Sequence, residues 1–200
     1  MDLSGGFREW AGIIHSDGTV ARTIVPFTPF HMGPALAFKA ISGRYFSVLV
    51  FGFAQIAMDI EPLIGMIRHA DILHGWTHTY AGATLIALMV AVIAPPLSRW
   101  ILVRWNVELE RHGAGWLASH SVIGRVAALT GAFIGTYSHV ALDSIMHSDM
   151  APLWPWDKSN ELLGVISIDD LHAVCVIAGA FGVVTWFALG LRARRNRRTG

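Results

Sequence analysis

The chain has 200 residues, of which 54% are hydrophobic and only 14% are charged, whereas soluble globular proteins carry about 25% charged residues. This composition excludes an ordinary soluble protein and predicts a membrane protein, and the formal net charge of +1 gives no support to a nucleic-acid partner. The single cysteine, Cys175, excludes a disulfide framework or a thiolate zinc site within one chain, so any metal must be bound by histidine and carboxylate.

The first 25 residues lack the uninterrupted apolar core of a cleavable signal peptide. We predict that residues 1–25 form a poorly ordered N-terminal extension and that residues 26–191 form a single membrane helical domain. Residues 192–200 follow as a basic tail.

The apolar stretch over residues 34–58 is interrupted by Lys39 and Arg44. Two arrangements fit this pattern. One is a broken helix that crosses the membrane, and the other is a re-entrant hairpin of two helices of about 12 residues each, with Arg44 at its tip. We favour the hairpin, because it returns Asp59 to the side of the membrane where His31 lies.

Two carboxylates, Asp59 and Glu61, follow this stretch, and Pro62 is expected to end the helix there. Acids at a helix end are usually a solvated terminus, but these two are expected at the same depth as His78. We therefore predict Asp59 as a metal ligand and Glu61 as the general base, since Glu61 lies two residues from a ligand and is not needed as one.

Three further stretches, over residues 79–98, 126–142 and 173–191, are each about 17 to 20 residues long and are expected to span the membrane as helices. The fold class is therefore an all-α, polytopic membrane bundle of about three full spans plus the N-terminal hairpin or broken helix. Two of the spans carry small residues, which favour close contact between helices in lipid. These residues are Gly131, Gly135, Ala178, Gly179 and Gly182.

Histidines and acids gather at one end of these spans. His74 and His78 are four residues apart, so on a helix both imidazoles would point to one face. His139, Asp143 and His147 repeat the same spacing, but the outer two would lie about 12 Å apart and cannot bind one ion. We predict His78, His139 and Asp143 as metal ligands, His31 and His74 as further ligands, and His147 as a ligand of a second ion or of the substrate.

The last span opens with Asp169, Asp170 and His172. These residues are either additional ligands for a second metal or the substrate, or partners that orient the ligating imidazoles. An ordinary polar helix terminus explains them equally well.

Basic residues set the expected orientation. Five arginines lie between Arg192 and Arg198, so the C-terminus is expected in the cytoplasm. The connection over residues 99–125, which is also rich in arginine, would lie on the same side. The acid-rich connections over residues 59–78 and 147–170 would then face outward, together with the predicted metal site.

The order of the motifs resembles a known family. Phe-Thr-Pro-Phe-His-Met-Gly-Pro at residues 27–34, Asp-Ile-Glu-Pro at 59–62, His-Gly-Trp-Thr-His-Thr at 74–79, Ser-His-xxx-Asp at 138–143 and Pro-Leu-Trp-Pro at 152–155 together resemble the YdjM-like (LexA-regulated) group of inner-membrane metal-dependent hydrolases. The resemblance implies a bacterial inner-membrane protein with a metal site.

We predict a membrane-bound hydrolase in which metal-activated water attacks an ester or phosphoester bond at the outer face of the membrane. One or two divalent ions are expected, with zinc favoured by the imidazole and carboxylate ligands, and manganese or iron as alternatives. The expected partners are membrane lipid and a small-molecule or lipid substrate.

Two other classes fit part of the pattern. A transporter of metal ions or protons would also carry intramembrane acids and histidines, but it would spread them through the membrane depth, whereas residues 79–98 and 173–191 have uncharged interiors. A b-type haem protein would also place histidines on several helices, but it has no use for Asp59 and Asp143.

Overall fold

The computed structural model describes residues 13–14, 20–21 and 29–199, and it confirms the all-α architecture. Among the described residues, three helices are long and apolar enough to cross a membrane: α3 (Val48–Ile67), α4 (Tyr80–Arg111) and α6 (Ile168–Thr199). The other elements are α2 (Gly33–Ser42), α5 (Arg125–Met146), the 3-10 turns η1 (Pro29–Met32), η2 (Gly43–Tyr45), η3 (Trp76–His78) and η4 (Gly115–Leu117), and a two-residue antiparallel pair of β1 (Ile13–Ile14) with β2 (Val20–Ala21). The predicted disorder of residues 1–25 otherwise concerns residues outside those described.

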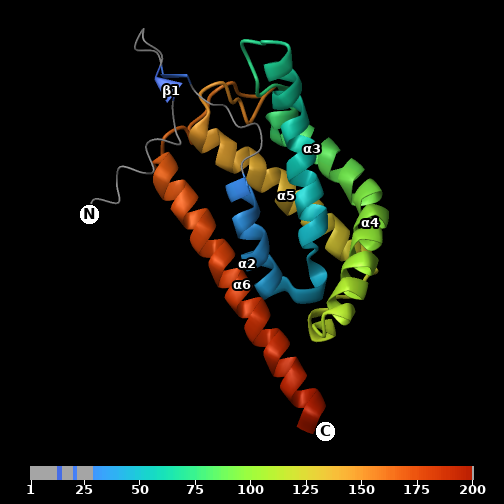
Figure 1. Ribbon diagram of the computed structural model, residues 1–200. Coiled ribbons are helices and arrows are strands. Elements are labelled where there is room, and N and C mark those ends of the chain that lie inside the picture. Colours follow the sequence, from blue (N-terminus) through green and yellow to red (C-terminus); the bar gives the residue numbers. More distant parts are fainter. Residues whose placement is uncertain (1–12, 15–19, 22–28, 200) are drawn as a thin grey trace, which may run out of the picture.

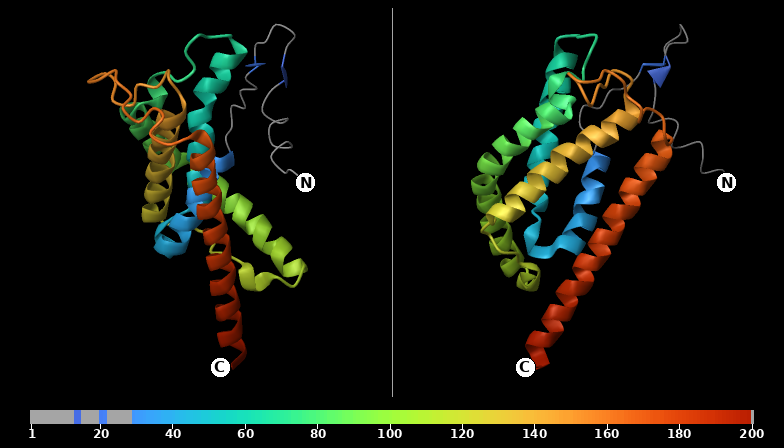
Figure 2. Two further views of the ribbon diagram at one scale, coloured as in Figure 1. Left: turned by 90° about the vertical axis from the view of Figure 1, so that its left-hand side faces the viewer. Right: turned by 180° about the vertical axis from the view of Figure 1, so that it is seen from behind.

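Helices α3, α4 and α5 pack against one another, whereas α2 packs chiefly against α6. In Figure 1 α6 stands at one edge of the molecule, with α2 drawn between it and α3. Figure 2 shows that α6 extends well beyond the other helices at the end that carries the C-terminus. The molecule is thus a three-helix bundle flanked by a two-helix pair.

The core of the bundle is built from small and medium side chains. A Cβ placed on Gly135 of α5 would lie 2.7 Å from the Cβ of Ala54 and 3.1 Å from the carbonyl oxygen of Phe51, both on α3. The predicted close contact at this glycine is confirmed, and it lets the two backbones approach without an intervening side chain. The fully buried core residues at the centre are Val50, Ala54, Met58, Ala83, Ala87, Ala132 and Val140.

The α2–α6 pair depends on glycine at the crossing. A Cβ on Gly182 would overlap the backbone of Leu36, and a Cβ on Gly33 would overlap the carbonyl of Cys175. The same reasoning holds for Gly179, where a Cβ would lie 3.3 Å from the Cα of Gly33. The predicted small-residue face of the last span is therefore the surface that receives α2.

The N-terminal segment forms a hairpin rather than one broken helix. Helix α2 has 10 residues, about 15 Å, which is half the thickness of a hydrocarbon core. Gly43 takes a left-handed φ of 51° in the turn, a conformation that glycine adopts readily. Lys39 closes the turn by donating its Nζ hydrogens to the carbonyls of Gly43 and Phe46, at 2.8 and 2.9 Å. The second arm, α3, is longer than the predicted 12 residues and is itself long enough to span.

Several predicted helix ends are wrong, because the helices run on past a proline or past charged residues. Pro62 lies inside α3 instead of ending it, and α4 runs through Pro95 and Pro96 as far as Arg111. A proline removes one backbone hydrogen bond from a helix, and the surrounding turns of these long helices tolerate that loss. The predicted tail from residue 192 continues α6 to Thr199. The division of the chain into an extension, a membrane domain and a tail stays a prediction.

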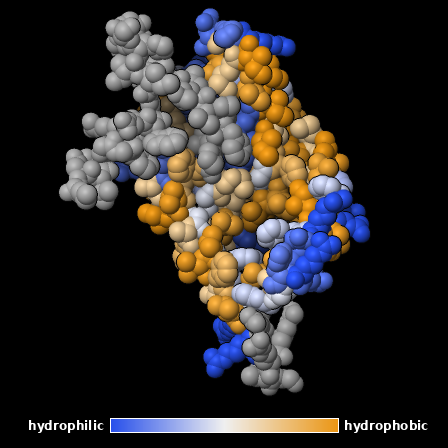
Figure 3. All heavy atoms as spheres, in the orientation of Figure 1, coloured by the Kyte–Doolittle hydropathy of each residue, from blue (hydrophilic) through white to orange (hydrophobic). Residues whose placement is uncertain are grey.

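The surface agrees with a membrane environment. On the face drawn in Figure 3, hydrophobic side chains cover most of the middle of the molecule, and hydrophilic residues gather toward its ends. Large apolar side chains are widely exposed on α6, including Val174, Ile177, Phe181 and Val184. In water such a surface would be a strong liability, whereas in lipid it matches the solvent.

Replacing Gly182 with alanine should separate α2 from α6, because the new Cβ has no room beside the Leu36 backbone. We expect a loss of about 1 to 3 kcal/mol of stability, measured as a lower midpoint of thermal unfolding in detergent. Gly124→Ala is the matched control, since no described residue other than its chain neighbours has an atom within 4 Å of a Cβ at Gly124. Equal midpoints for the two variants would contradict this packing.

Candidate metal centre

Asp143 lies near the end of α5 with only 4% of its surface exposed, and four imidazoles surround its carboxylate. The distance from each Nε2 to the nearer carboxylate oxygen is 3.0 Å for His139, 3.5 Å for His78, 3.7 Å for His31 and 3.9 Å for His74. The structure thus brings together five of the predicted ligands, which come from three separate segments of the chain.

The helical part of this cluster follows directly from the sequence. His139 precedes Asp143 by one turn of α5, as the spacing of four predicted. His31 arrives from η1, directly before α2, and its ring meets the His139 ring edge-on with centroids 5.0 Å apart. The hairpin therefore brings one predicted ligand to the cluster from each of its two ends, because Asp59 Oδ1 also lies 3.5 Å from His139 Nε2.

The prediction that His74 and His78 share a helix face is wrong. Thr79 caps α4 by accepting a hydrogen bond from the backbone nitrogen of Gly82 at 3.0 Å, so the helix begins after both histidines. His74 lies in the loop and His78 in η3. Their ring centroids are nevertheless 4.9 Å apart, so the loop achieves the convergence that was expected from a helix.

Gln55 fixes the orientation of His139. The amide nitrogen of Gln55 donates to the carbonyl of Gly135 at 2.9 Å, which turns its Oε1 toward His139 Nδ1 at 2.6 Å. Nδ1 must then carry the proton and donate it to Gln55. The lone pair of His139 Nε2 is left facing Asp143 and Asp59.

Two carboxylates fix the loop histidines in the same way. Asp149 Oδ1 lies 2.9 Å from His74 Nδ1, and its other oxygen accepts from the backbone nitrogens of Leu73 and His74. Glu61 Oε2 lies 3.4 Å from His78 Nδ1. For both histidines the proton belongs on Nδ1, and Nε2 presents its lone pair to Asp143.

Lone pairs on imidazole nitrogens that face carboxylate oxygens repel one another unless a proton or a cation lies between them. One carboxylate cannot hold protons for four imidazoles. Both nitrogens of His31 and the Nε2 atoms of His78 and His139 are buried with no hydrogen-bond partner in the part of the chain that the structure describes, and buried polar atoms are normally satisfied. Three or four such nitrogens with carboxylate oxygens are the donor set that zinc and similar ions prefer, so the residues fit a divalent metal.

The ligand atoms divide into groups that share one carboxylate. His31, His139 and Asp143 form one group, and His74, His78 and Asp143 form another, with the ligand atoms of each group within 4.8 Å of one another. The sharing of Asp143 would allow its carboxylate to bridge two ions.

A third group is formed by His74, His147 and Asp149. The ring of His147 stacks on that of His74 with centroids 4.3 Å apart. Asp149 Oδ1 already accepts from His74 Nδ1. A metal bound by this third group would have to replace that hydrogen bond, which orients His74 Nε2 toward Asp143. His147 is therefore placed beside the cluster rather than on Asp143.

The titratable groups of the cluster that lie outside the long helices have the charge states that metal binding requires. Burial lowers the pKa of His31 to about 4, although the nearby Asp143 opposes the shift. Burial also lowers the pKa of His74, so both imidazoles are neutral near pH 7 and are able to bind a metal. Burial acts to raise the pKa of Asp149, but hydrogen bonds from His74 and from the backbone outweigh it and lower this pKa.

Glu61 does not have the surroundings expected of a free general base. Its Oε2 accepts hydrogen bonds from the backbone nitrogen and the hydroxyl of Thr77 and lies beside His78 Nδ1, the nitrogen turned away from Asp143. These contacts hold the 3-10 turn and orient His78. Asp59, whose side chain is 17% exposed, is the carboxylate at the rim of the cluster.

The acids at the start of α6 stay outside the cluster. Asp170 accepts from the Ser167 hydroxyl at 2.7 Å, and the Ser167 hydroxyl accepts from the Asp170 backbone nitrogen, which is the arrangement of a helix cap. Asp169 is exposed. His172 stacks on Phe30 with centroids 4.3 Å apart, which places it near His31 but not on Asp143.

Sequence reasoning missed Gln55, Thr77 and Asp149. Gln55 is an isolated polar residue in the apolar part of α3. An amide at such a position was the signal that the sequence offered. Asp149 follows His147 by two residues, but only the fold shows that it reaches His74.

A family model described as the YdjM inner membrane protein matches residues 63–198. The matched region contains His74, His78, His139 and Asp143, and it begins after His31 and Asp59. No curated protein and no solved structure matches the chain.

Replacing Gln55 with leucine should weaken metal binding without unfolding the protein, because His139 would lose the acceptor that fixes its Nδ1 proton. We expect an affinity loss of about 10- to 100-fold, measured by competition with a chromophoric chelator. Ser98→Ala is the control, because Ser98 is equally buried on α4 and its hydroxyl has no hydrogen-bond partner among the described residues. Unchanged affinity in Gln55→Leu would contradict the assigned orientation.

Proposed function

This chain belongs to the YdjM inner membrane protein family, and from that premise we propose that it is a membrane-bound, metal-dependent hydrolase centred on Asp143. The observation that carries the proposal is the convergence of the Nε2 atoms of four imidazoles on one buried carboxylate, three of them with Nδ1 held by an oxygen acceptor. A purely structural cluster would pair these nitrogens with donors or with water-exposed groups.

We assign two ions to the cluster. His31 and His139 would hold one and His74 and His78 the other, with Asp143 between them. Zinc suits this mixture of imidazole and carboxylate, and manganese and iron are the alternatives. When bound, such ions supply an activated water and polarise the bond to be cleaved.

The remaining residues have separable roles in this proposal. Gln55, Glu61 and Asp149 orient the ligating imidazoles through Nδ1. Asp59 lies at the rim of the cluster, with Oδ1 3.5 Å from His139 Nε2. Its carboxylate accepts no hydrogen bond from another described residue. We therefore move the general base from Glu61 to Asp59, which would accept the proton released when water attacks.

The substrate is proposed to be an ester or phosphoester at the membrane surface, such as a lipid. Exposed tryptophans support this, because Trp76, Trp154 and Trp156 all lie in connections at the metal-centre end of the bundle, with 44 to 81% of their surface exposed. Tryptophan favours the boundary between lipid and water. A substrate anchored there would meet the cluster without leaving the membrane.

The buried interior supports an enzyme over a transporter. The ionisable groups of the bundle core that the structure describes lie together at one end, around Asp143. Farther along α3, α4 and α5 the described core is mainly apolar, with Val50, Ala54, Ala87 and Ala132, and its buried polar side chains, such as Ser98 and Thr136, are uncharged. A pathway for ions would need ionisable groups through that depth.

Turnover and metal content together test the proposal. Purified wild-type protein should contain about two equivalents of metal by elemental analysis and should hydrolyse model phosphodiesters or phospholipids. Asp143→Asn should lose most of the metal and all activity, because the shared ligand loses its charge. Asp59→Asn should keep the metal and lose at least about 100-fold in rate, the usual contribution of a general base.

The control is His112→Ala, a histidine at the end of α4 away from the cluster, which should keep both metal and activity. Metal-free wild-type protein would overturn the metal centre. Metal-loaded protein that leaves every ester and phosphoester intact would leave the centre standing and overturn the hydrolase.

We also propose that the C-terminus is cytoplasmic and that the metal centre faces outward, supported by the arginines of α6 beyond Leu191. Single cysteines at two exposed positions test this in a Cys175→Ser background. A cysteine replacing Glu161, in the connection before α6, should react with an impermeant maleimide in intact cells. A cysteine replacing Ser119, in the connection before α5, should react only after permeabilisation, and the reverse pattern would invert the topology.

A further inference from the structure

One face of α4 carries an exposed strip that the metal centre does not use. Its first half is apolar, with side chains 49 to 75% exposed at Leu85, Met89, Val92 and Ile93. The strip continues at spacings of three and four residues, which keep one helix face, into Pro96, Arg99, Trp100, Val103 and Arg104. We call these two parts the apolar half and the basic half of the α4 strip.

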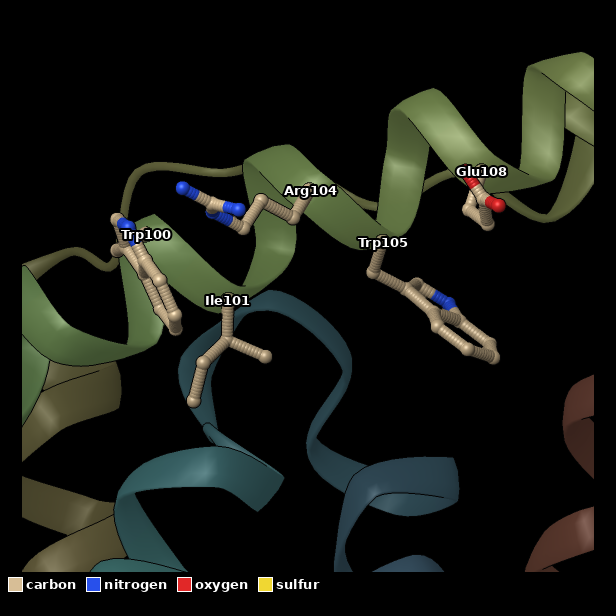
Figure 4. Close-up of a pocket in the computed structure, with 5 residues that line it drawn as sticks. All are labelled: Trp100, Ile101, Arg104, Trp105 and Glu108. Carbon is tan, nitrogen blue, oxygen red and sulfur yellow. The ribbon is translucent and has the colours of Figure 1, made fainter.

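The basic half forms an open hollow of about 620 Å³. Its lining contains two arginines, Arg99 and Arg104, and no carboxylate. The neighbouring hollow of about 340 Å³, drawn in Figure 4, contains Glu108 in addition to Arg104. The first hollow therefore suits an anion better than the second.

The two arginines are available to a ligand. Among the described residues neither Arg99 nor Arg104 forms an ion pair, whereas Arg111 on the same helix binds Glu108 at 2.9 Å. The Arg104 guanidinium lies over the Trp100 ring, with its carbon 4.4 Å from the ring centroid. This stacking holds the group in place and leaves its edge free to bind phosphate oxygens in pairs.

The dimensions of the strip match a phospholipid in one leaflet. The 11-residue step from Leu85 to Pro96 covers about 16 Å at the rise of an α-helix, and one leaflet contributes about 15 Å to the hydrocarbon core. The basic half therefore lies at the depth of the phosphates when the apolar half lies among acyl chains. Trp100 and Trp105, 59 and 56% exposed, fit the same boundary.

We propose that the α4 strip binds an anionic phospholipid, with its phosphate between Arg99 and Arg104 and its acyl chains along the apolar half. The basic half lies in the second half of α4, whereas His78 of the cluster around Asp143 directly precedes the start of that helix, and the site is independent of the proposed hydrolase activity. Two arginines without an acid favour a lipid with net negative charge over a zwitterionic one.

Lipid binding to the purified full-length chain tests this proposal. Dioleoylphosphatidylglycerol and dioleoylphosphatidylcholine are titrated separately, and bound lipid is counted by native mass spectrometry with thermal unfolding as a second readout. Wild-type protein should prefer phosphatidylglycerol by up to about 30-fold, or roughly fivefold for each arginine. Arg99→Gln combined with Arg104→Gln should abolish the preference, and Arg111→Gln, whose guanidinium is already paired with Glu108, should keep it.

A preference that survives in the double variant, or that is lost equally in Arg111→Gln, would overturn the site. Displacement of phosphatidylglycerol by inorganic phosphate at equal concentration would also overturn it, because the hollow would then bind phosphate without the acyl chains. Helix content and metal content report on folding. If the double variant loses helix, the two single variants replace it, each with an expected loss of about fivefold.

Discussion

The structure depends on keeping a charged carboxylate inside a helical membrane bundle. A buried ion is strongly unfavourable unless it is compensated, and the groups around Asp143 in the described part of the chain are imidazoles, whose lone pairs can face it only with a proton or a cation between. The end of the bundle is arranged around this need: the hairpin brings His31 and Asp59, the loop before α4 brings His74 and His78, and α5 brings His139. Removing the charge would remove the reason for these segments to meet.

The outer contacts of the cluster are as specific as the inner ones. Three imidazoles each donate the Nδ1 proton to an oxygen on another segment: two of these oxygens lie on α3 and one lies on the connection after α5. The Gln55 bond in turn needs the carbonyl of Gly135, which is close only because a glycine there lets α5 approach α3. The orientation of the His139 imidazole thus depends on the close packing of α3 and α5, which the small residues of the core allow.

Much of this site could be predicted from the sequence because helical spacing is local. His139 and Asp143 are four residues apart, and that spacing places them together in any α-helix. The convergence of His31, His74 and His78 was predicted from their common depth, although the loop that carries His74 was not. Pro62 misled the predicted end of α3, because a proline weakens a helix by an amount that packing can overcome. Gln55 and Asp149 could not be assigned, because their partners are more than 70 residues away.

The contact between α2 and α6 has a consequence for how the chain is made. Helix α2 packs chiefly against α6, through Gly33 and Gly182, and it carries His31 at its start. A ribosome synthesises the first of these helices long before the last. The imidazole of His31 therefore cannot be fixed in position until α6 has entered the membrane, so the cluster around Asp143 is assembled only after α6 has been translated.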